Sequence, residues 1–322
     1  MEPVAASNLN HNIHHLVPMQ LFKYDKTGYP SGTFSFRDDP DATNAITYYT
    51  DVGDWKMPFK VLRSSARQKP ALMLLHGLGL HPASFRGIAG HLLSVCDLVL
   101  PDYTGFTSPD GWPEGGVSLR VLAHAIMRIP VALGLDRIHI GGSSLGGGLS
   151  LMAAVDFPNL IDRIVLFNPA VFPQALPSFY RLVRVPILGP LIMLFMSPKD
   201  MACGVATIGY VDSSHMDDEL RHMYHDNMKP AVNRFRLLDL IRHLPHGDTE
   251  TQHYLVHTGK LPQDVLVIWG QQDKLLAAGT DERLRQSLPH LQFHNFPDLS
   301  HLPHEESPNR IGPIVARFLA EK

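Results

Sequence analysis

Short apolar runs alternate with stretches of helical length along most of the chain. Runs rich in Val, Ile, Leu and Phe predict strands, and they lie at 46–50, 59–63, 71–75, 95–100, 137–140, 164–167, 265–269 and 292–296. Helices are expected at about 82–93, 117–133, 149–155, 280–287 and from 308 onward. The polar turn 51–54 predicts an antiparallel hairpin of the first two strands. From residue 71 onward strand and helix alternate, which predicts a mostly parallel sheet covered on both faces by helices.

The alternation stops between 169 and 261, where the pattern is helical and interrupted by prolines. A segment of this length is too long for a loop, so we expect a helical insertion over the strand ends. Within it, Leu182–Met196 is markedly apolar and is expected to pack on the core, to line an apolar substrate pocket, or to do both. The expected division is an N-terminal extension (1–45), a core (46–170 and 260–322) and an inserted cap or lid (171–259).

Composition narrows the class of protein. The chain has 322 residues, 44% of them hydrophobic and 18% charged, which indicates a globular protein with a sizeable core. The formal net charge of −3 implies neither nucleic acid nor an anionic membrane as a partner. No apolar run is long enough to predict a membrane-spanning helix, and Met1-Glu2-Pro3 does not begin a signal peptide, so a cytoplasmic protein is expected. The oligomeric state stays open between monomer and homodimer.

A glycine-rich turn follows the strand at 137–140 and precedes a helix. Gly142, Ser144 and Gly146 form Gly-x-Ser-x-Gly, and no other frame fits, because Leu145 would occupy the second glycine position if Ser143 were the central residue. Such a strained turn needs glycines where neighbouring backbones come close, and it exposes the serine hydroxyl beside a helix N-terminus. An ordinary serine in a glycine-rich turn remains an alternative, as does a phosphate-binding loop, although no Lys follows as in a P-loop.

Two further polar residues come directly after predicted strands. Asp273 follows the strand at 265–269, and His301 follows the strand at 292–296. A serine becomes a nucleophile when a base takes its proton, and histidine has the pKa for that near neutral pH. These residues, in the chain order Ser144, Asp273, His301, resemble the serine α/β-hydrolase superfamily with a helical cap, which includes carboxylesterases, lipases and carbon–carbon-bond hydrolases. The resemblance covers about residue 46 to the C-terminus.

The resemblance implies the α/β-hydrolase fold and a role for each residue. Ser144 would be the nucleophile, His301 the base and Asp273 the carboxylate that orients the imidazole. The backbone amides of Leu78, after His76-Gly77, and of Leu145 would form the oxyanion hole. No cofactor is implied.

Several alternatives compete for these roles. His304 lies near His301, but His301-x4-Glu306-x-Pro308 matches the family spacing and favours His301. Some relatives carry their acid after the preceding strand, where this chain has Asn168 and no carboxylate, which leaves Asp273. Two groups at helical spacing invite a metal interpretation, although we interpret them as polar helix faces and expect no metal: His215, Asp218, His222 and His225, and the pair His253 and His257. Cys96 and Cys203 are too few for a disulfide framework or a zinc site.

The expected function is hydrolysis of a small-molecule carboxylic ester, or a close acyl compound, with an apolar acyl or alkyl part. A carbon–carbon-bond hydrolase acting on a dienoate-type diketone would use the same triad. A ligand receptor that kept the fold and lost turnover is the third hypothesis.

Overall fold

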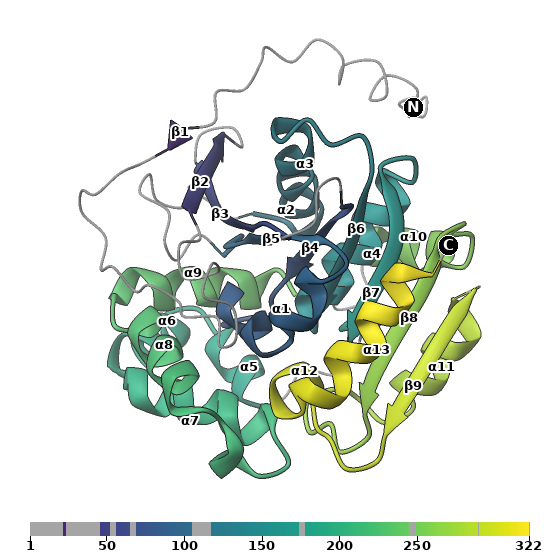
Figure 1. Ribbon diagram of the computed structural model, residues 1–322. Helices are drawn as coiled ribbons and strands as arrows, with labels where there is room; N and C mark the ends of the chain where they lie inside the picture. Colours follow the sequence, from purple (N-terminus) through teal and green to yellow (C-terminus); the bar gives the residue numbers. More distant parts are fainter. Residues whose placement is uncertain are drawn as a thin grey trace, which may run out of the picture.

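A computed structural model describes residues 22–23, 46–51, 56–64, 69–104, 117–173, 178–244, 249–288 and 290–321. A twisted sheet runs through the molecule with helices on both sides, and further helices gather at one end of the strands (Figure 1). The N-terminal extension expected at 1–45 lies outside the described residues except for Phe22–Lys23.

The sheet has nine strands in the described part of the chain, in the order β1-β2-β3-β5-β4-β6-β7-β8-β9. β2 and β3 form the expected antiparallel hairpin, β1 pairs antiparallel with β2, and β3 pairs antiparallel with β5. All pairs from β5 to β9 are parallel. The bounds are β1 Phe22–Lys23, β2 Ile46–Asp51, β3 Lys56–Leu62, β4 Ala71–Leu75, β5 Asp97–Pro101, β6 Ile138–Ser143, β7 Ile161–Phe167, β8 Asp264–Gly270 and β9 Leu291–Phe296.

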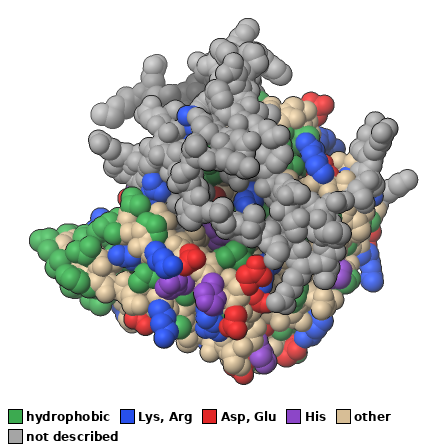
Figure 2. All heavy atoms as spheres, turned by 60° about the vertical axis from the view of Figure 1, so that its left-hand side comes forward, with side chains coloured by type: hydrophobic (Ala, Val, Ile, Leu, Met, Phe, Trp, Pro, Cys, Tyr) green, Lys and Arg blue, Asp and Glu red, His purple; other side chains and the backbone are tan. Residues whose placement is uncertain are grey.

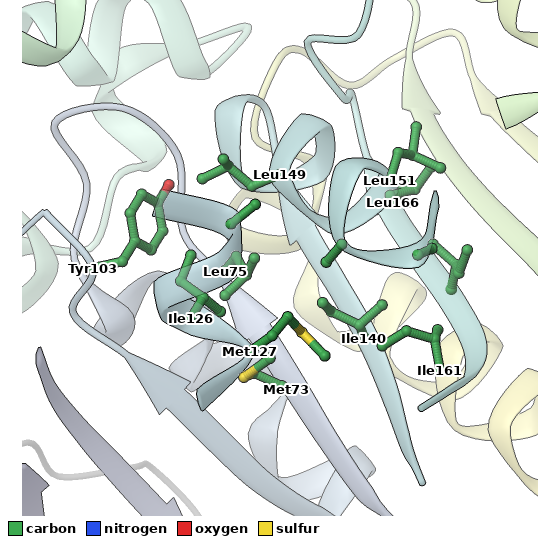
Figure 3. Close-up of a cluster of buried hydrophobic side chains, with 14 of the residues drawn as sticks. Met73, Leu75, Tyr103, Ile126, Met127, Ile140, Leu149, Leu151, Ile161 and Leu166 are labelled. Carbon is green, nitrogen blue, oxygen red and sulfur yellow. The ribbon is translucent and has the colours of Figure 1, made fainter. Parts of the chain in front are cut away.

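Alternation along the buried strands divides the core into two layers. In β4, Met73 and Leu75 contribute to one hydrophobic cluster, whereas Leu72 and Leu74 contribute to the other. Successive side chains of a strand point to opposite faces, so a fully apolar strand supplies both layers. Figure 3 shows the first layer, in which Leu149 from α4 lies over the sheet.

Helices cover both faces of the sheet. α2 (Leu119–Ile126), α3 (Arg128–Ala132) and α4 (Leu145–Asp156) bury side chains in the first layer, and α1 (Arg86–Leu93) and α13 (Pro308–Ala320) bury theirs in the second. The other helices of the core are the 3-10 turn η4 (Pro82–Phe85), α11 (Thr280–Ser287) and α12 (Pro303–Glu306).

The helix expected at 117–133 is divided in the structure, and the expectation of one continuous helix is wrong. Pro130 has no N–H to donate to the carbonyl of Ile126, so the chain breaks into α2 and α3 at Met127.

Between β7 and β8 the described residues form six α-helices and one 3-10 turn, and we call this segment the helical insertion. Its elements are α5 (Ser178–Val183), α6 (Leu188–Phe195), α7 (Pro198–Gly209), η5 (Ser213–His215), α8 (Asp218–Met228), α9 (Ala231–Arg242) and α10 (Thr249–Thr258). A third hydrophobic cluster holds α5, α6 and α9 together around Val183, Met193 and Leu238. Leu78 of the loop after β4 packs against this cluster, so the insertion covers that loop.

The expectation for the apolar segment Leu182–Met196 is only partly met. Val183, Gly189 and Met193 are buried, but Ile187 and Phe195 are 78% and 81% exposed. α5 and α6 are short and bury one side each, and a Cβ on Gly189 would lie 1.8 Å from the carbonyl oxygen of Val183. The opposite side of the segment therefore faces outward, and placing all of it against the core or in a pocket is wrong.

Candidate active site

Ser144 lies at the junction of β6 and α4, in a backbone conformation that non-glycine residues rarely adopt. Its φ is 53° and its ψ is −117°, and its side chain is buried. A Cβ on Gly142 would lie 2.4 Å from the carbonyl carbon of Gly146, and a Cβ on Gly146 would lie 2.0 Å from the carbonyl oxygen of Leu75. The two glycines are required by these close approaches, as the sequence motif predicts. Ser143, by contrast, is a regular residue of β6, paired with Phe167.

Asp273 and His301 follow β8 and β9, two neighbouring parallel strands, and their side chains meet. Nδ1 of His301 and Oδ2 of Asp273 lie 2.7 Å apart, and both side chains are about 5% exposed or less. The other carboxylate oxygen accepts the amide N–H groups of Leu275 and Leu276 at 2.7 and 2.9 Å. Burial alone would raise the pKa of Asp273, but the charge and hydrogen bond of His301 and these two amides lower it to about 2. The carboxylate is therefore ionised at neutral pH.

Asn168 connects this pair to the adjacent strand, and sequence reasoning treated its position only as a place without an acid. Its side-chain amide donates to Oδ2 of Asp273 at 2.7 Å and to the carbonyl of Gly270 at 3.1 Å. Its Oδ1 accepts the N–H of Gly270 at 2.8 Å. Asn168 is fully buried, with φ 38°, a region that Asn tolerates better than most residues. Asn168 and His301 therefore both bond to Oδ2 of Asp273, and together they fix the orientation of the carboxylate.

Backbone hydrogen bonds place Ser144 beside the same group of residues. The N–H of Ser144 donates to the carbonyl of Phe167 at 3.0 Å, and the N–H of Ala170 donates to the carbonyl of Ser144 at 2.9 Å. The backbone of Ser144 is thus hydrogen-bonded to one residue before Asn168 and to one residue after it. Nε2 of His301 is buried and makes no hydrogen bond within the described part of the chain, and bonds of this kind often form only when substrate is present.

Two residues, Leu145 and Leu78, are expected to supply the backbone amides of an oxyanion hole. Leu145 is the first residue of α4, so its N–H has no acceptor within the helix. Leu78 follows Gly77, and a Cβ on Gly77 would lie 3.4 Å from Cβ of Ser144. The loop after β4 therefore runs directly past the serine. Tyr103 stabilises this loop, since its hydroxyl donates to the carbonyl of His76 and its ring stacks on the imidazole of His76.

His304 lies in a different environment from His301. It is completely buried between the rings of Phe85 and Phe167, and Nε2 lies 2.9 Å from Oγ of Ser84. Burial lowers the pKa of His304 to about 3, with a smaller contribution from His301. This histidine is neutral and packed, and its hydrogen-bond partner is Ser84.

The other histidines singled out from the sequence lie on the helical insertion. Nδ1 of His222 bonds to the carbonyl of Asp218, and Nδ1 of His257 to that of His253, one turn earlier in each helix. Among the described residues, no group of three or more His, Cys, Asp or Glu side chains is placed to hold a metal ion.

Comparison with known proteins agrees with this architecture. Residues 70–188 match the family model described as the alpha/beta hydrolase fold. This match supports membership of the α/β-hydrolase superfamily, and the fold class expected from the sequence is confirmed.

Among curated proteins, the chain is similar to a 2-hydroxy-6-oxo-6-phenylhexa-2,4-dienoate hydrolase of Burkholderia cepacia. The two are 24% identical over 81% of this chain and 92% of the relative. An uncharacterized protein of Mycobacterium tuberculosis is also 24% identical, over 87% of this chain and 82% of the relative.

Solved structures show the same fold at low identity. A 2-hydroxy-6-oxo-6-phenylhexa-2,4-dienoate hydrolase from Rhodococcus sp. strain RHA1 superposes with a TM-score of 0.69 at 23% identity, covering 86% of this chain and 99% of that one. The protein Cfl2 of Burkholderia cenocepacia superposes with a TM-score of 0.75 at 16% identity, covering 88% of this chain and 98% of that one.

Proposed function

We propose that the chain is a serine hydrolase that cleaves a carboxylic ester, or a related acyl compound, with an apolar part. The observation that carries the proposal is the buried pair of His301 and Asp273, 2.7 Å apart, beside a serine on a strained glycine turn. The proposal is also supported by the positions of the three residues, which follow the parallel strands β6, β8 and β9 at the edge of the sheet where open α/β folds bind ligands.

In the first half of the reaction, Ser144 Oγ attacks the carbonyl carbon of the substrate, and its proton passes to Nε2 of His301. His301 donates its Nδ1 proton to Asp273, so Nε2 is the nitrogen with a lone pair for that proton. The ionised carboxylate stabilises the imidazolium as it forms. The amides of Leu78 and Leu145 bind the negative oxygen of the tetrahedral intermediate.

The intermediate then collapses to an acyl-enzyme on Ser144, and the alcohol leaves with the proton from His301. In the second half, His301 takes a proton from water while the water oxygen attacks the acyl carbon. The acid is released and Ser144 regains its proton.

An apolar substrate is favoured by the surroundings of the proposed oxyanion hole. Leu78 packs against both the main core and the cluster of the helical insertion, and Leu237 of α9 lies 3.5 Å from where a Cβ of Gly79 would be. Each buried methylene of a substrate chain gains about 0.8 kcal/mol, which is three- to fourfold in kcat/KM. We expect kcat/KM for p-nitrophenyl esters to rise from acetate to medium chains and then level off.

Covalent labelling tests the proposal most directly. A fluorophosphonate probe should label the wild type at Ser144, whereas Ser144→Ala should not react and Ser143→Ala should. A wild type that is folded but neither labelled nor active on any ester would contradict it, and would favour a receptor.

A second candidate is hydrolysis of a carbon–carbon bond in a dienoate-type diketone, and the names of the similar proteins favour it. The same residues would serve. Assaying 2-hydroxy-6-oxo-6-phenylhexa-2,4-dienoate beside the ester series distinguishes the two candidates. The substrate class with the higher kcat/KM identifies the function, provided that this activity disappears in Ser144→Ala.

A further inference from the structure

We propose that the helical insertion carries a docking surface for the face of a lipid bilayer that contains anionic lipid. The surface, which we call the apolar ridge, consists of exposed hydrophobic side chains on α5, α6 and the turn between them: Leu182, Val185, Ile187, Leu191, Leu194 and Phe195. Figure 2 shows hydrophobic side chains gathered at a protruding edge of the molecule.

The ridge is more apolar than an ordinary solvent-exposed helix surface. α6 is Leu-Gly-Pro-Leu-Ile-Met-Leu-Phe, with no polar side chain in eight residues. α9, which packs against α6, adds Val232 and Phe235, 52% and 39% exposed. Large contiguous apolar patches on a protein surface mark interaction sites, whereas single exposed hydrophobic residues do not.

The backbone holds the most exposed aliphatic side chain in an unfavourable conformation. Ile187 precedes α6 with φ 70° and ψ −51°, and it is 78% exposed. A β-branched residue is a genuine outlier at positive φ. Strain that brings a hydrophobic side chain into water is typical of a binding element rather than of a stabilising one.

The charges around the ridge fit an anionic surface. From Ser178 to Asp200 the chain has three cations, Arg181, Arg184 and Lys199, and one acidic residue, Asp200 in the first turn of α7. Arg184 donates to the backbone carbonyl of Arg242 at 3.1 Å, which brings the end of α9 to the same rim. The net charge of −3 for the whole chain conceals this local excess of positive charge. An apolar surface bordered by Lys and Arg is the pattern of segments that lie in the membrane interface.

The geometry favours lying on a bilayer over crossing it. No single helix of the described residues is long and apolar enough to span a membrane, and the α6–α7 pair that passes on composition is bent by 99°. α6 has eight residues, which is about 12 Å of helix, against a hydrocarbon core of about 30 Å. Interfacial helices bury their apolar side only about 5–10 Å deep, a depth that a convex ridge can reach.

Vesicle cosedimentation of the full chain tests the proposal. The probes are vesicles of phosphatidylcholine alone and vesicles in which about a third of the lipid is phosphatidylserine. We expect the wild type to pellet with the anionic vesicles, and to be released from them by high salt. Ile187→Asp combined with Phe195→Asp should reduce the partition coefficient at least about tenfold, and Arg181→Gln combined with Lys199→Gln should weaken binding to anionic vesicles only.

A matched control variant is Val121→Asp combined with Val256→Asp. These valines are 59% and 60% exposed on α2 and α10, outside the ridge, and the change in net charge is the same. Circular dichroism and the melting temperature check that all variants fold. Control variants that lose binding as strongly as the ridge variant would overturn the proposal, as would equal binding to both kinds of vesicle.

Sedimentation velocity without lipid separates the bilayer from a second copy of the chain. A wild type that is dimeric, and becomes monomeric in the Ile187→Asp, Phe195→Asp variant, would overturn the proposal and assign the ridge to a protein interface. A folded monomer that ignores both kinds of vesicle would overturn it as well. Neither result bears on Ser144, because fluorophosphonate labelling is measured without lipid.

Discussion

Two groups of a serine, a histidine and a carboxylate in the described part of the chain differ in the direction of their hydrogen bonds, and we propose the first of them as the nucleophilic site. In the first, Nδ1 of His301 lies 2.7 Å from the carboxylate of Asp273, which leaves Nε2 as the nitrogen available to a serine. In the second, Ser84 donates its hydroxyl proton to Glu305, so Nε2 of His304 must donate to the serine oxygen. His304 therefore has no lone pair directed at Ser84 and cannot be its base.

The carboxyl groups of Asp273 and Glu305 also differ, because their pKa values are shifted in opposite directions. Asp273 has a pKa of about 2, despite its burial, because of His301 and two backbone amides. Burial raises the pKa of Glu305, and hydrogen bonds from Ser84, Tyr224 and Tyr210 offset this only in part. One cluster holds an anion that orients an imidazole, and the other closes a packed polar contact between the core and the helical insertion. The two groups contain the same types of residue, so what distinguishes them is which atom donates each hydrogen bond.

The largest expected difference between the clusters is in turnover. Ser144→Ala should lower kcat about 10⁶-fold, because a triad without its nucleophile loses the covalent step. Ser84→Ala should stay within a few-fold of the wild type and lose about 1–3 kcal/mol of stability, since the partners of Ser84 are buried. Ester hydrolysis and thermal unfolding measure both; the reverse pattern would show that the wrong serine has been chosen.

Double variants sharpen the comparison of the histidines. His301→Ala added to Ser144→Ala should cause almost no further loss of kcat, because nucleophile and base act as one unit. His304→Gln should retain most activity alone. Additive losses from Ser144 and His301 would remove His301 from the role of base.

A smaller effect is expected at Asn168, which orients Asp273 without meeting substrate. Asn168→Ala should lower kcat about 10²-fold, by misplacing the carboxylate and the imidazole, with KM little changed. The control is Gln263→Ala, which removes another buried amide, bonded to the carbonyls of Pro158 and Ile161. It should cost stability and leave kcat unchanged. Equal losses of kcat in the two variants would reduce Asn168 to a structural role.

The smallest effect concerns stability at acid pH. The pKa of His304 is about 3 in the folded chain and about 6.5 when unfolded, so between these values the unfolded chain binds one proton more. The free energy of unfolding should therefore fall by about 1.4 kcal/mol per pH unit through this residue as the pH drops below 6.5. Urea unfolding of the wild type and of His304→Gln from pH 7 to pH 5 should show a shallower slope in the variant. Parallel slopes would mean that His304 titrates normally.

The sequence predicted what depends on local geometry. Gly142 and Gly146 are required by the close approaches around Ser144, and a predicted strand precedes each of Ser144, Asp273 and His301. The break between α2 and α3 was also within reach, because Pro130 forbids a continuous helix.

The features that could not be predicted from the sequence depend on tertiary contacts. Nothing local marks Asn168, since its amide finds Asp273 and Gly270 only because β7 and β8 are neighbours. The outward direction of Ile187 and Phe195 depends on which side of α6 meets α9, and an apolar run by itself predicts burial. β1 has two residues, too few to show any periodicity.

The hydrogen bonds of Asn168 have a consequence for how the insertion between β7 and β8 can change during evolution. The helical insertion leaves the sheet just beyond β7 and returns at the start of β8, whereas the bonds of Asn168 to Gly270 join the end of β7 directly to the end of β8. Strands in register stand about 4.8 Å apart, and closing a longer or shorter excursion between fixed ends changes the free energy only logarithmically with length. Because the bonds of Asn168 do not pass through the insertion, the length of the insertion can change while Asn168 keeps the ends of β7 and β8, and the residues that follow them, in place.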